Sequence, residues 1–264
     1  MTVIILAAGQ GVRLSSEYEP KENYITKCLV DINGKPALLR LIDQIRKLTD
    51  EKIIVVCGHK KENVQEILIN KNIKLIYNNR FKRDTNLFSL YLAIKDIKDH
   101  ALIIEADSVV SQKHLEEFYK AIFFLNSSKS FSVPLSLWSS IGIKKNLDTG
   151  GFINFKNDLP IDKNLYSADS IEISSSPKDN AYKMFGITYF SKELVKKWFI
   201  YSKDLVQIYN KSQQIYPYFH YPFLNGFFNE FIYCFDFEDF PIAFNTYKQL
   251  LEARHRASNW DIMN

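Results

Sequence analysis

The sequence has few cysteines and no long apolar run, and both absences exclude classes of protein. Its three cysteines, Cys28, Cys57 and Cys234, are an odd number without metal-type spacing. The N-terminus has neither the basic region nor the cleavage pattern of a signal peptide, so we expect a reduced, cytoplasmic setting. No apolar run reaches the roughly 18 residues that a membrane span needs, and no membrane insertion is expected.

Two common phosphate-binding patterns are also missing. The dinucleotide pattern G-x-G-x-x-G starts at Gly9 and Gly11 but would need a third glycine at Leu14. The second predicted strand ends without the acidic residue that binds ribose in such proteins. A P-loop is excluded as well, because Gly34-Lys35 is followed by Pro36 and lacks the upstream glycine.

Composition predicts one folded domain without a nucleic-acid-binding surface. At 264 residues and 46% hydrophobic content, the chain can bury a full core. The formal net charge of +4 is mild, and the lysine pairs are far apart in the sequence. They are typical of a solvated surface, so no nucleic-acid partner is expected.

In the first half of the chain, β-type runs alternate with helical periods, which predicts a three-layer α/β architecture around a parallel sheet. The predicted strands are Val3–Leu6, Lys52–Val56, Lys74–Tyr77 and Leu102–Glu105, and the predicted helices are Ala37–Leu48, Glu62–Ile69, Asn86–Ile94 and Gln112–Leu125. Beyond residue 130, short segments punctuated by Gly, Ser and Asn predict a small antiparallel insertion that includes Gly150–Phe155. A strand at Met184–Phe190 and a helix Lys192–Ile200 capped by Ser191 follow.

The most informative segment is the first one, where the apolar strand Val3–Leu6 breaks abruptly into Ala7-Ala8-Gly9-Gln10-Gly11-Val12-Arg13. The small residues remove side-chain bulk where backbone N–H groups could approach an anion. Arg13 adds a positively charged fork that matches phosphate oxygens. This pattern indicates a turn that binds phosphate.

Together with Lys27 and Gly34-Lys35-Pro36, this L-A-A-G-x-G-x-R-L segment resembles the start of the nucleotidyltransferases, which activate sugar phosphates or alcohol phosphates with an NTP. The resemblance implies a Rossmann-like fold of the GT-A type, with a mostly parallel sheet in a single domain, residues 1–264. Residues 1–130 would bind the nucleotide and residues 131–264 the acceptor. Thr26 stands where the family usually has Pro, and Lys21, which follows Pro20, is an alternative to Lys27.

The resemblance also implies roles for individual residues near this turn. Arg13 and Lys27 would be catalytic residues that hold the triphosphate. The nucleotide would contact the turn residues Leu6, Ala7, Ala8, Gly9 and Gly11.

The segment Asn78–Ala93 resembles the N-x-x-[FY]-x-x-T-N-x-x-S-L motif of small-molecule cytidylyltransferases, such as phosphocholine and phosphonate cytidylyltransferases. This resemblance places Asn86 and Ser89 beside the base and ribose. The structural alternative is that Asp84 or Thr85 caps a helix that begins near Asn86.

Two residues are candidate Mg²⁺ ligands. Asp107 follows a buried strand, at the edge where open α/β sheets bind ligands, and the corresponding aspartate holds Mg²⁺ in the family. Glu105 should point to the other side of the strand and play a supporting role. Asn245 fits the family's [DN]-T-x-x-x-L segment as a second ligand, but Asn before Thr could equally cap a helix Tyr247–Arg256.

Aromatic residues are concentrated between positions 198 and 228. We interpret them as core or as a homodimer surface, with a cage for a cationic headgroup as the alternative. The members of this stretch are Trp198, Tyr216, Tyr218, Phe219, Tyr221, Phe223, Phe227 and Phe228, and His220 within it is expected to be structural.

The sequence therefore predicts an enzyme that uses CTP, with Mg²⁺ as cofactor, to convert a small phosphorylated or phosphonylated alcohol or amine into its CDP- or CMP-linked form. Pyrophosphate would be the second product. A sugar-1-phosphate nucleotidyltransferase would share these motifs. A nucleotide sensor without activity would be expected to lose Arg13, Lys27 or Asp107, and all three are present.

Overall fold

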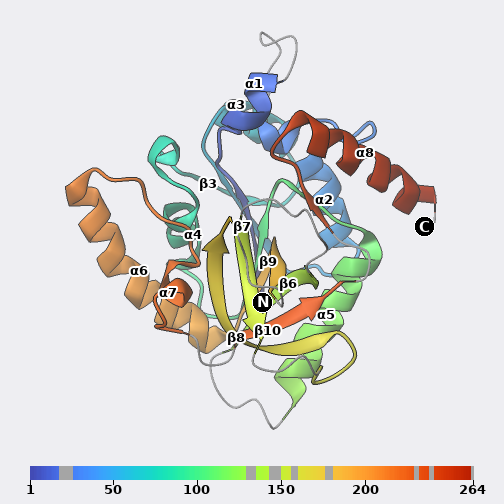
Figure 1. The fold of residues 1–264 in the computed structure, drawn as a ribbon. Coiled ribbons are helices and arrows are strands. Elements are labelled where there is room, and N and C mark those ends of the chain that lie inside the picture. Colours follow the sequence, from blue (N-terminus) through green and yellow to red (C-terminus); the bar gives the residue numbers. More distant parts are fainter. Residues whose placement is uncertain are drawn as a thin grey trace.

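The structure, a computed structural model, describes residues 1–17, 26–128, 135–142, 150–155, 160–175, 181–228, 232–237 and 241–262. A single nine-stranded sheet forms the centre, with helices packed on both faces (Figure 1). Helices α4 (Leu87–Ile94), α6 (Lys192–Ser212) and α7 (Tyr221–Leu224) cover one face, and α2 (Ala37–Arg46) and α5 (Gln112–Ser127) cover the other. In the part of the chain that is described, no helix is long and apolar enough to cross a membrane.

The first half of the sheet is parallel, as the alternation predicted. Strands β1 (Thr2–Ala7), β2 (Lys52–Cys57), β3 (Lys74–Tyr77) and β4 (Ala101–Glu105) lie in the order β3-β2-β1-β4. Thr2 at the start of β1 lies opposite Lys52 of β2 on one side and Ala101 of β4 on the other. The two central strands, β1 and β4, are almost continuously apolar because helices cover both of their faces.

The second half corrects the prediction of a mostly parallel sheet. The order continues from β4 through β9-β6-β10-β8-β7, and every pairing there except β6 with β10 is antiparallel. Strands β7, β8 and β9 follow one another with fewer than ten residues between them, too few for the crossover that a parallel pair requires. The bounds are β6 Ser136–Gly142, β7 Gly150–Phe155, β8 Leu165–Ser174, β9 Tyr182–Phe190 and β10 Ile232–Asp236.

The remaining elements lie around this sheet. They are the helices α1 Val12–Glu17, α3 Lys61–Ile67 and α8 Tyr247–Ile262, the 3-10 turns Lys27–Leu29 and Phe81–Arg83, and the two-residue strands β5 Ser108–Val109 and β11 Ile242–Ala243. Ser191 caps α6 as predicted, because its hydroxyl accepts a hydrogen bond of 3.2 Å from the Leu194 amide. Helix α6 continues past Ile200 to Ser212, since Ser202 and Val206 extend its buried face.

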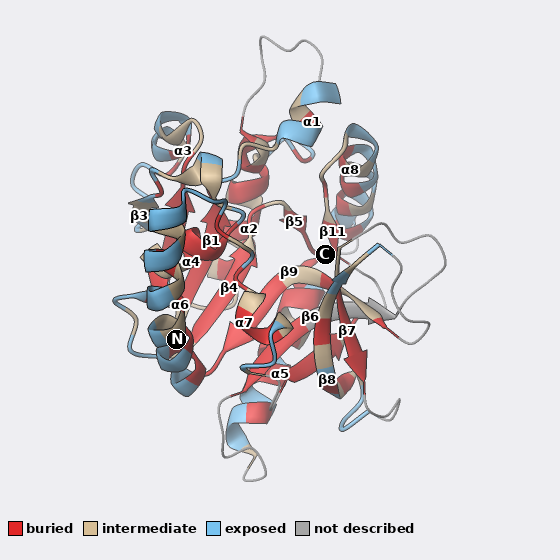
Figure 2. Ribbon diagram, turned by 60° about the vertical axis from the view of Figure 1, so that its left-hand side comes forward, coloured by how far each residue is buried: buried red, intermediate tan, exposed pale blue. Residues whose placement is uncertain are grey.

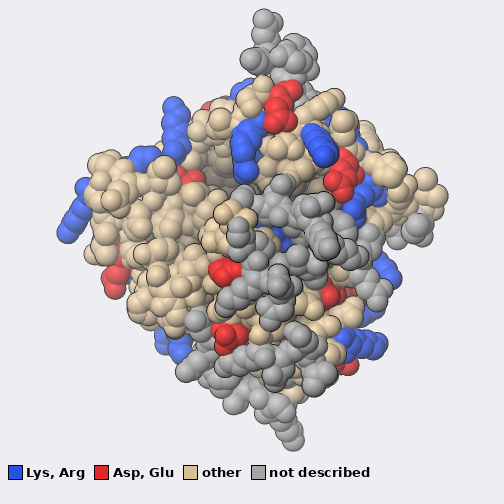
Figure 3. Space-filling model, viewed as in Figure 1, with Lys and Arg blue, Asp and Glu red and all other residues tan. Residues whose placement is uncertain are grey.

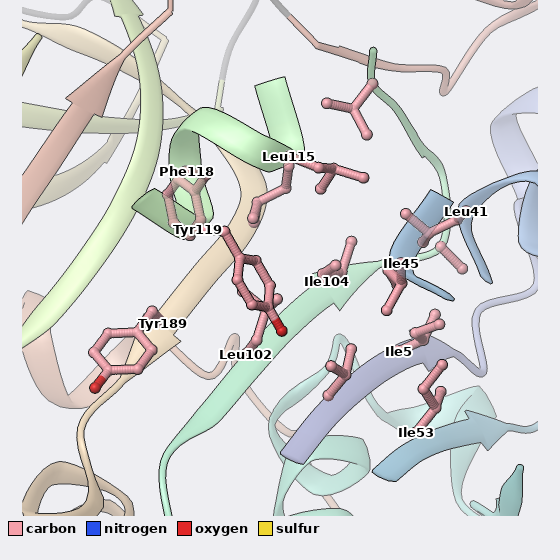
Figure 4. Packing of buried hydrophobic residues seen from close by; sticks show 14 of the residues in the cluster. Ile5, Leu41, Ile45, Ile53, Leu102, Ile104, Leu115, Phe118, Tyr119 and Tyr189 are labelled. Atoms are coloured by element: carbon pink, nitrogen blue, oxygen red, sulfur yellow. The ribbon is translucent and has the colours of Figure 1, made fainter. Parts of the chain in front are cut away.

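The sheet separates two hydrophobic clusters (Figure 2). On one face, Ile5, Ile53 and Ile104 pack against helices α2 and α5 (Figure 4). On the other face, half of the predicted aromatic stretch is core: Trp198, Tyr216, Phe219 and Phe223 are each 2% exposed or less. These four side chains belong to the hydrophobic cluster on this face, as the core interpretation predicted.

Helix α8 is held against the rest of the protein by a third hydrophobic cluster and by hydrogen bonds. Trp260 and Phe244 are buried in this cluster. Arg40 forms two hydrogen bonds with Asp261, at 2.8 and 2.6 Å, and Arg254 donates to the Asp31 carbonyl at 3.0 Å. Asn33 also donates to the Arg254 carbonyl and to the Ser258 hydroxyl, so the segment just before Gly34-Lys35-Pro36 is tied to α8.

Charged side chains on the face seen in Figure 3 are scattered, with Lys and Arg interspersed among Asp and Glu. The single-sign patch typical of nucleic-acid binding is not seen among the described residues of this face.

Candidate active site

A cavity of about 720 Å³ opens at the carboxyl ends of β1 and β4. These strands are neighbours in the sheet, but the next strand of the sheet after each lies on opposite sides: β2 follows β1 on one side, and β6 follows β4 on the other, beyond β9. Such a switch point is where open α/β sheets bind ligands. The cavity is lined by the glycine turn after β1, the start of α4, the end of β4, β7, β9, residues 218–220 and Asn245.

Four predicted site residues from distant parts of the chain meet in this cavity. The Lys27 ammonium forms an ion pair with the Asp107 carboxylate and donates a hydrogen bond of 2.9 Å to Asn245 Oδ1. Arg13 donates to the same oxygen at 3.0 Å. Only 13% of the Lys27 side chain and 19% of the Asp107 side chain are exposed, so solvent screens their attraction less than at the surface. We call Arg13, Lys27, Asp107 and Asn245 the polar cluster; Lys21 lies outside the described residues.

Thr246, rather than Asn245, caps helix α8. The Gln249 amide donates to the Thr246 hydroxyl at 3.3 Å, while the Gln249 side chain accepts from the Thr246 amide at 3.2 Å. This reciprocal pair is a capping box. It leaves the Asn245 side chain directed at Lys27 and Arg13.

The glycine turn is held in place by neighbours that leave little room. Gly11 has φ +64°, a conformation that favours glycine. A Cβ on Gly58 would come within 2.7 Å of the Ala8 carbonyl oxygen, so the end of β2 must carry glycine to pack against this turn. The buried Thr26 hydroxyl donates to the Gly9 carbonyl at 3.4 Å, which ties the lysine-bearing segment to the turn.

Asp84 caps helix α4, as the structural alternative proposed. Its carboxylate accepts hydrogen bonds from the Phe88 amide at 2.9 Å and from the Ser89 amide at 2.8 Å. The Ser89 hydroxyl donates to Asp84 at 2.7 Å and accepts from Asn78 at 2.9 Å. Burial raises the pKa of Asp84, although these donors counteract the effect. Ser89 thus lines the cavity while its hydroxyl is bound within the protein.

The Asn86 side chain connects two segments that line the cavity, the end of β4 and the backbone at Phe219. Its amide nitrogen donates to Glu105 at 2.8 Å, and its amide oxygen accepts from the Phe219 backbone at 2.7 Å. Glu105 itself lines the cavity, and burial together with the negative charge of Asp107 raises its pKa to about 7. The prediction that Glu105 points to the other side of the strand was wrong, because side chains two residues apart in an extended strand lie on the same face, and Glu105 and Asp107 both line the cavity.

Three further residues line the cavity: Tyr218, which the sequence placed in the core, a homodimer surface or a cationic cage, His220, which was expected to be structural, and Lys183, which was not predicted. Tyr218 is 43% exposed and lines the cavity, in contrast to its buried aromatic neighbours. His220 also lines it and stacks on Phe219, with ring centroids 4.3 Å apart, and burial lowers its pKa to about 3. Lys183 on β9 had no motif that could identify it, because its place depends on the pairing of β9 with β7.

Comparison with known proteins finds several relatives with similar sequences. The choline-phosphate cytidylyltransferase of Streptococcus pneumoniae is 32% identical over 108 residues, which are 41% of this chain and 45% of that protein. The 2-aminoethylphosphonate cytidylyltransferase of Lancefieldella rimae is 28% identical over 198 residues, 74% of this chain and 68% of that protein. The bifunctional protein GlmU of Caldicellulosiruptor saccharolyticus is 35% identical over 129 residues, 44% of this chain and 26% of that protein. The matches to the first and third of these relatives cover less than half of their lengths.

Solved structures agree over nearly the whole chain. The CTP:phosphocholine cytidylyltransferase from Streptococcus pneumoniae superimposes with a TM-score of 0.71 at 19% identity, covering 97% of this chain and 98% of that one. UDP-glucose pyrophosphorylase in complex with UDP-glucose gives 0.70 at 12% identity, with 98% of both chains covered. At these identities the likeness shows the nucleotidyltransferase fold alone. The family described as the MobA-like NTP transferase domain matches residues 3–138, half of the chain, and the protein belongs to this family.

Proposed function

We propose that the protein is a CTP-dependent cytidylyltransferase that converts a small phosphorylated or phosphonylated alcohol or amine into its CDP- or CMP-linked form and releases pyrophosphate. The observation that carries this proposal is the polar cluster, in which Arg13, Lys27 and Asp107 meet in the cavity beside the glycine turn. Residues 1–130 would hold the nucleotide, and residues 131–264, which include Asn245, would bind the acceptor.

The reaction requires positioning and charge neutralisation. An oxygen of the acceptor phosphate or phosphonate attacks the α-phosphorus of CTP, a new P–O bond forms, and the bond to the bridging oxygen of pyrophosphate breaks. Arg13 and Lys27 would neutralise the charge on the triphosphate and on the leaving pyrophosphate. Backbone N–H groups of the turn from Ala8 to Gly11 would hold phosphate or base, so that the reacting atoms lie in line.

The polar cluster fits a Mg²⁺ ion. Asp107 and Asn245 both present an oxygen to the Lys27 ammonium, so two oxygen ligands from distant segments already converge on one cation. No group of three or more His, Cys, Asp or Glu that could hold a metal is found among the described residues. One carboxylate, one amide oxygen and the substrate phosphates are the type of ligand set that Mg²⁺ accepts. When bound, Mg²⁺ would neutralise phosphate charge.

Substitutions at positions 245 and 246 separate metal binding from helix capping. We expect Asn245→Ser to raise the Mg²⁺ concentration needed for half-maximal activity, and Asn245→Asp to lower it by adding charge. Thr246→Ala should instead cost about 1 kcal/mol of stability, because it removes the cap of α8, and should leave the Mg²⁺ profile near that of the wild type. Activity against Mg²⁺ concentration and a melting curve are measured for each variant. An unchanged profile in Asn245→Ser would remove Asn245 from the metal site.

CTP is expected to be the preferred nucleotide. The motif from Asn78 to Ala93 resembles cytidylyltransferases, and two of the relatives bear that activity in their names. Cytosine is small, so a tight pocket near Ala8, Gly9 and Ser89 could exclude purines by shape. Melting curves with each of the four NTPs and Mg²⁺ should show the largest shift with CTP, since a ligand at a hundredfold excess over Kd stabilises by about 2.7 kcal/mol.

Pyrophosphate release then identifies the acceptor. The acceptors to compare are phosphocholine, phosphoethanolamine, 2-aminoethylphosphonate, phosphorylated amino acids and sugar 1-phosphates. Equal turnover with ATP or GTP would refute the preference for CTP. Turnover of UTP with a sugar 1-phosphate would instead favour the second candidate, a sugar-1-phosphate nucleotidyltransferase, which the similarity to GlmU supports.

A further inference from the structure

We propose that Lys183 binds the phosphate or phosphonate group of the acceptor. This inference rests on the proposed function, since it assigns a residue to the second substrate of that reaction. Lys183 lies on β9 and lines the same cavity as Lys27 and Asp107.

The position of the Lys183 ammonium is determined by the pairing of β9 with β7. Phe152 on β7 is the register partner of Lys183, and its ring is fully buried. The Lys183 Nζ lies 4.6 Å from the centroid of this ring. A cation over an aromatic face is attracted by the quadrupole of the ring, which helps to hold the ammonium at this wall of the cavity.

Two glycines of β7 provide the space for this arrangement. A Cβ on Gly150 would overlap the Lys183 Nζ, and a Cβ on Gly151 would overlap the terminal methyl of Met184. Side chains at these positions would displace the ends of both β9 residues. The wall of the cavity is therefore shaped to admit the ammonium of Lys183.

The cavity thus contains cations in two places. Arg13 and Lys27 both contact Asn245 Oδ1 and come from the nucleotide-binding half. Lys183 comes from the other half, three residues before Gly186, and Gly186 packs against Glu105. At about 3.3 Å per residue, its backbone lies roughly 10 Å along β9 from that contact. Among the described residues that line the cavity, it is the only cation besides Arg13 and Lys27.

Two cation positions suit a reaction between two anions. The triphosphate and the acceptor phosphate repel each other at close range, and this repulsion grows as water is excluded. With Arg13 and Lys27 assigned to the triphosphate, a separate positive charge is needed for the acceptor. Lys183 supplies that charge from the half of the chain proposed to bind the acceptor.

Steady-state kinetics with both substrates varied test this assignment. Lys183→Met should raise the KM for every acceptor by about tenfold or more, the typical effect of losing a hydrogen bond to a charged group. The KM for CTP should stay within about twofold. Lys183→Arg should restore most of the acceptor affinity because it keeps the charge. Lys196→Met, which removes an exposed lysine of α6 outside the cavity, is the matched control.

Gly150→Ala provides a second test that leaves the charge in place. The added methyl should displace the ammonium and raise the acceptor KM in the same direction as Lys183→Met. An unchanged acceptor KM in Lys183→Met would overturn the inference. An equal or larger rise in the KM for CTP would also overturn it, because Lys183 would then hold the triphosphate.

Calorimetry separates this inference from the proposed function. Inorganic phosphate is titrated into the protein in the presence of saturating CTP and EDTA, so that the triphosphate site is filled and turnover is blocked. The wild type should bind phosphate at least tenfold more tightly than Lys183→Met. Equal binding by the two proteins, or no binding by the wild type, would reject the role of Lys183. Failure of the proposed function would appear elsewhere, as the absence of pyrophosphate release from CTP with every acceptor.

Discussion

Asp107→Asn should leave the fold intact and lower kcat by on the order of 10²–10³-fold, the typical cost of losing one group that stabilises charge in the transition state. Asp107 is the only acidic residue of the polar cluster, and its carboxylate pairs with Lys27 at the end of β4. Asparagine keeps the shape of the side chain but removes the anionic ligand for Mg²⁺. Pyrophosphate release at saturating Mg²⁺, together with a melting curve, measures the two effects separately.

The matched control for this variant is Asp43→Asn. Asp43 forms an ion pair with Lys35 on the surface, outside the cavity, and its side chain is 39% exposed. Removing its charge should change neither turnover nor Mg²⁺ dependence, and should affect stability by no more than about 1 kcal/mol. Near wild-type turnover in Asp107→Asn would mean that the metal is held elsewhere.

The sequence predicts the parallel half of the fold well, because each of the strands β1 to β4 is a short apolar run and a helix comes before the next strand of the sheet. The second half depends on contacts that local patterns do not encode. Strand β9 lies between β4 and β6, and β10 pairs with β6 from almost a hundred residues away. The sequence predicted β7 within a small antiparallel insertion and β9 as a strand, but it could not show that both belong to the main sheet and make it mixed.

The site likewise combines residues that local sequence patterns predict with residues whose positions depend on long-range contacts. The positions of Arg13 and Asp107 could be predicted because Arg13 follows the short glycine turn after β1 and Asp107 lies two residues past β4, so both lie at one edge of the sheet. Asn86 could be found by its motif, but its contacts with Glu105 and the Phe219 backbone depend on tertiary packing. Lys183 could not be predicted at all, since its position depends on the absence of side chains at Gly150 and Gly151 of a neighbouring strand.

Lys27→Met should lower kcat/KM for CTP by on the order of 10²–10³-fold, because it removes a cation that would neutralise the triphosphate and the leaving pyrophosphate. The Lys27 ammonium is bound by both Asp107 and Asn245, so it is held where the phosphates are proposed to lie. Lys35→Met, which breaks the exposed pair with Asp43, is the matched control and should retain activity.

The double variant Asp107→Asn with Lys27→Met shows whether the two residues act as a unit. Groups that serve the same step are strongly non-additive, so the combined loss should be much smaller than the product of the two single losses. Each protein is assayed for kcat and for the KM of CTP at saturating acceptor and Mg²⁺. If the losses simply multiply, Lys27 and Asp107 contribute independently, and the ion pair between them has no part in arranging the site. In that case Lys27 would be assigned to phosphate binding alone, and the arrangement of the metal site would rest on Asp107 and Asn245.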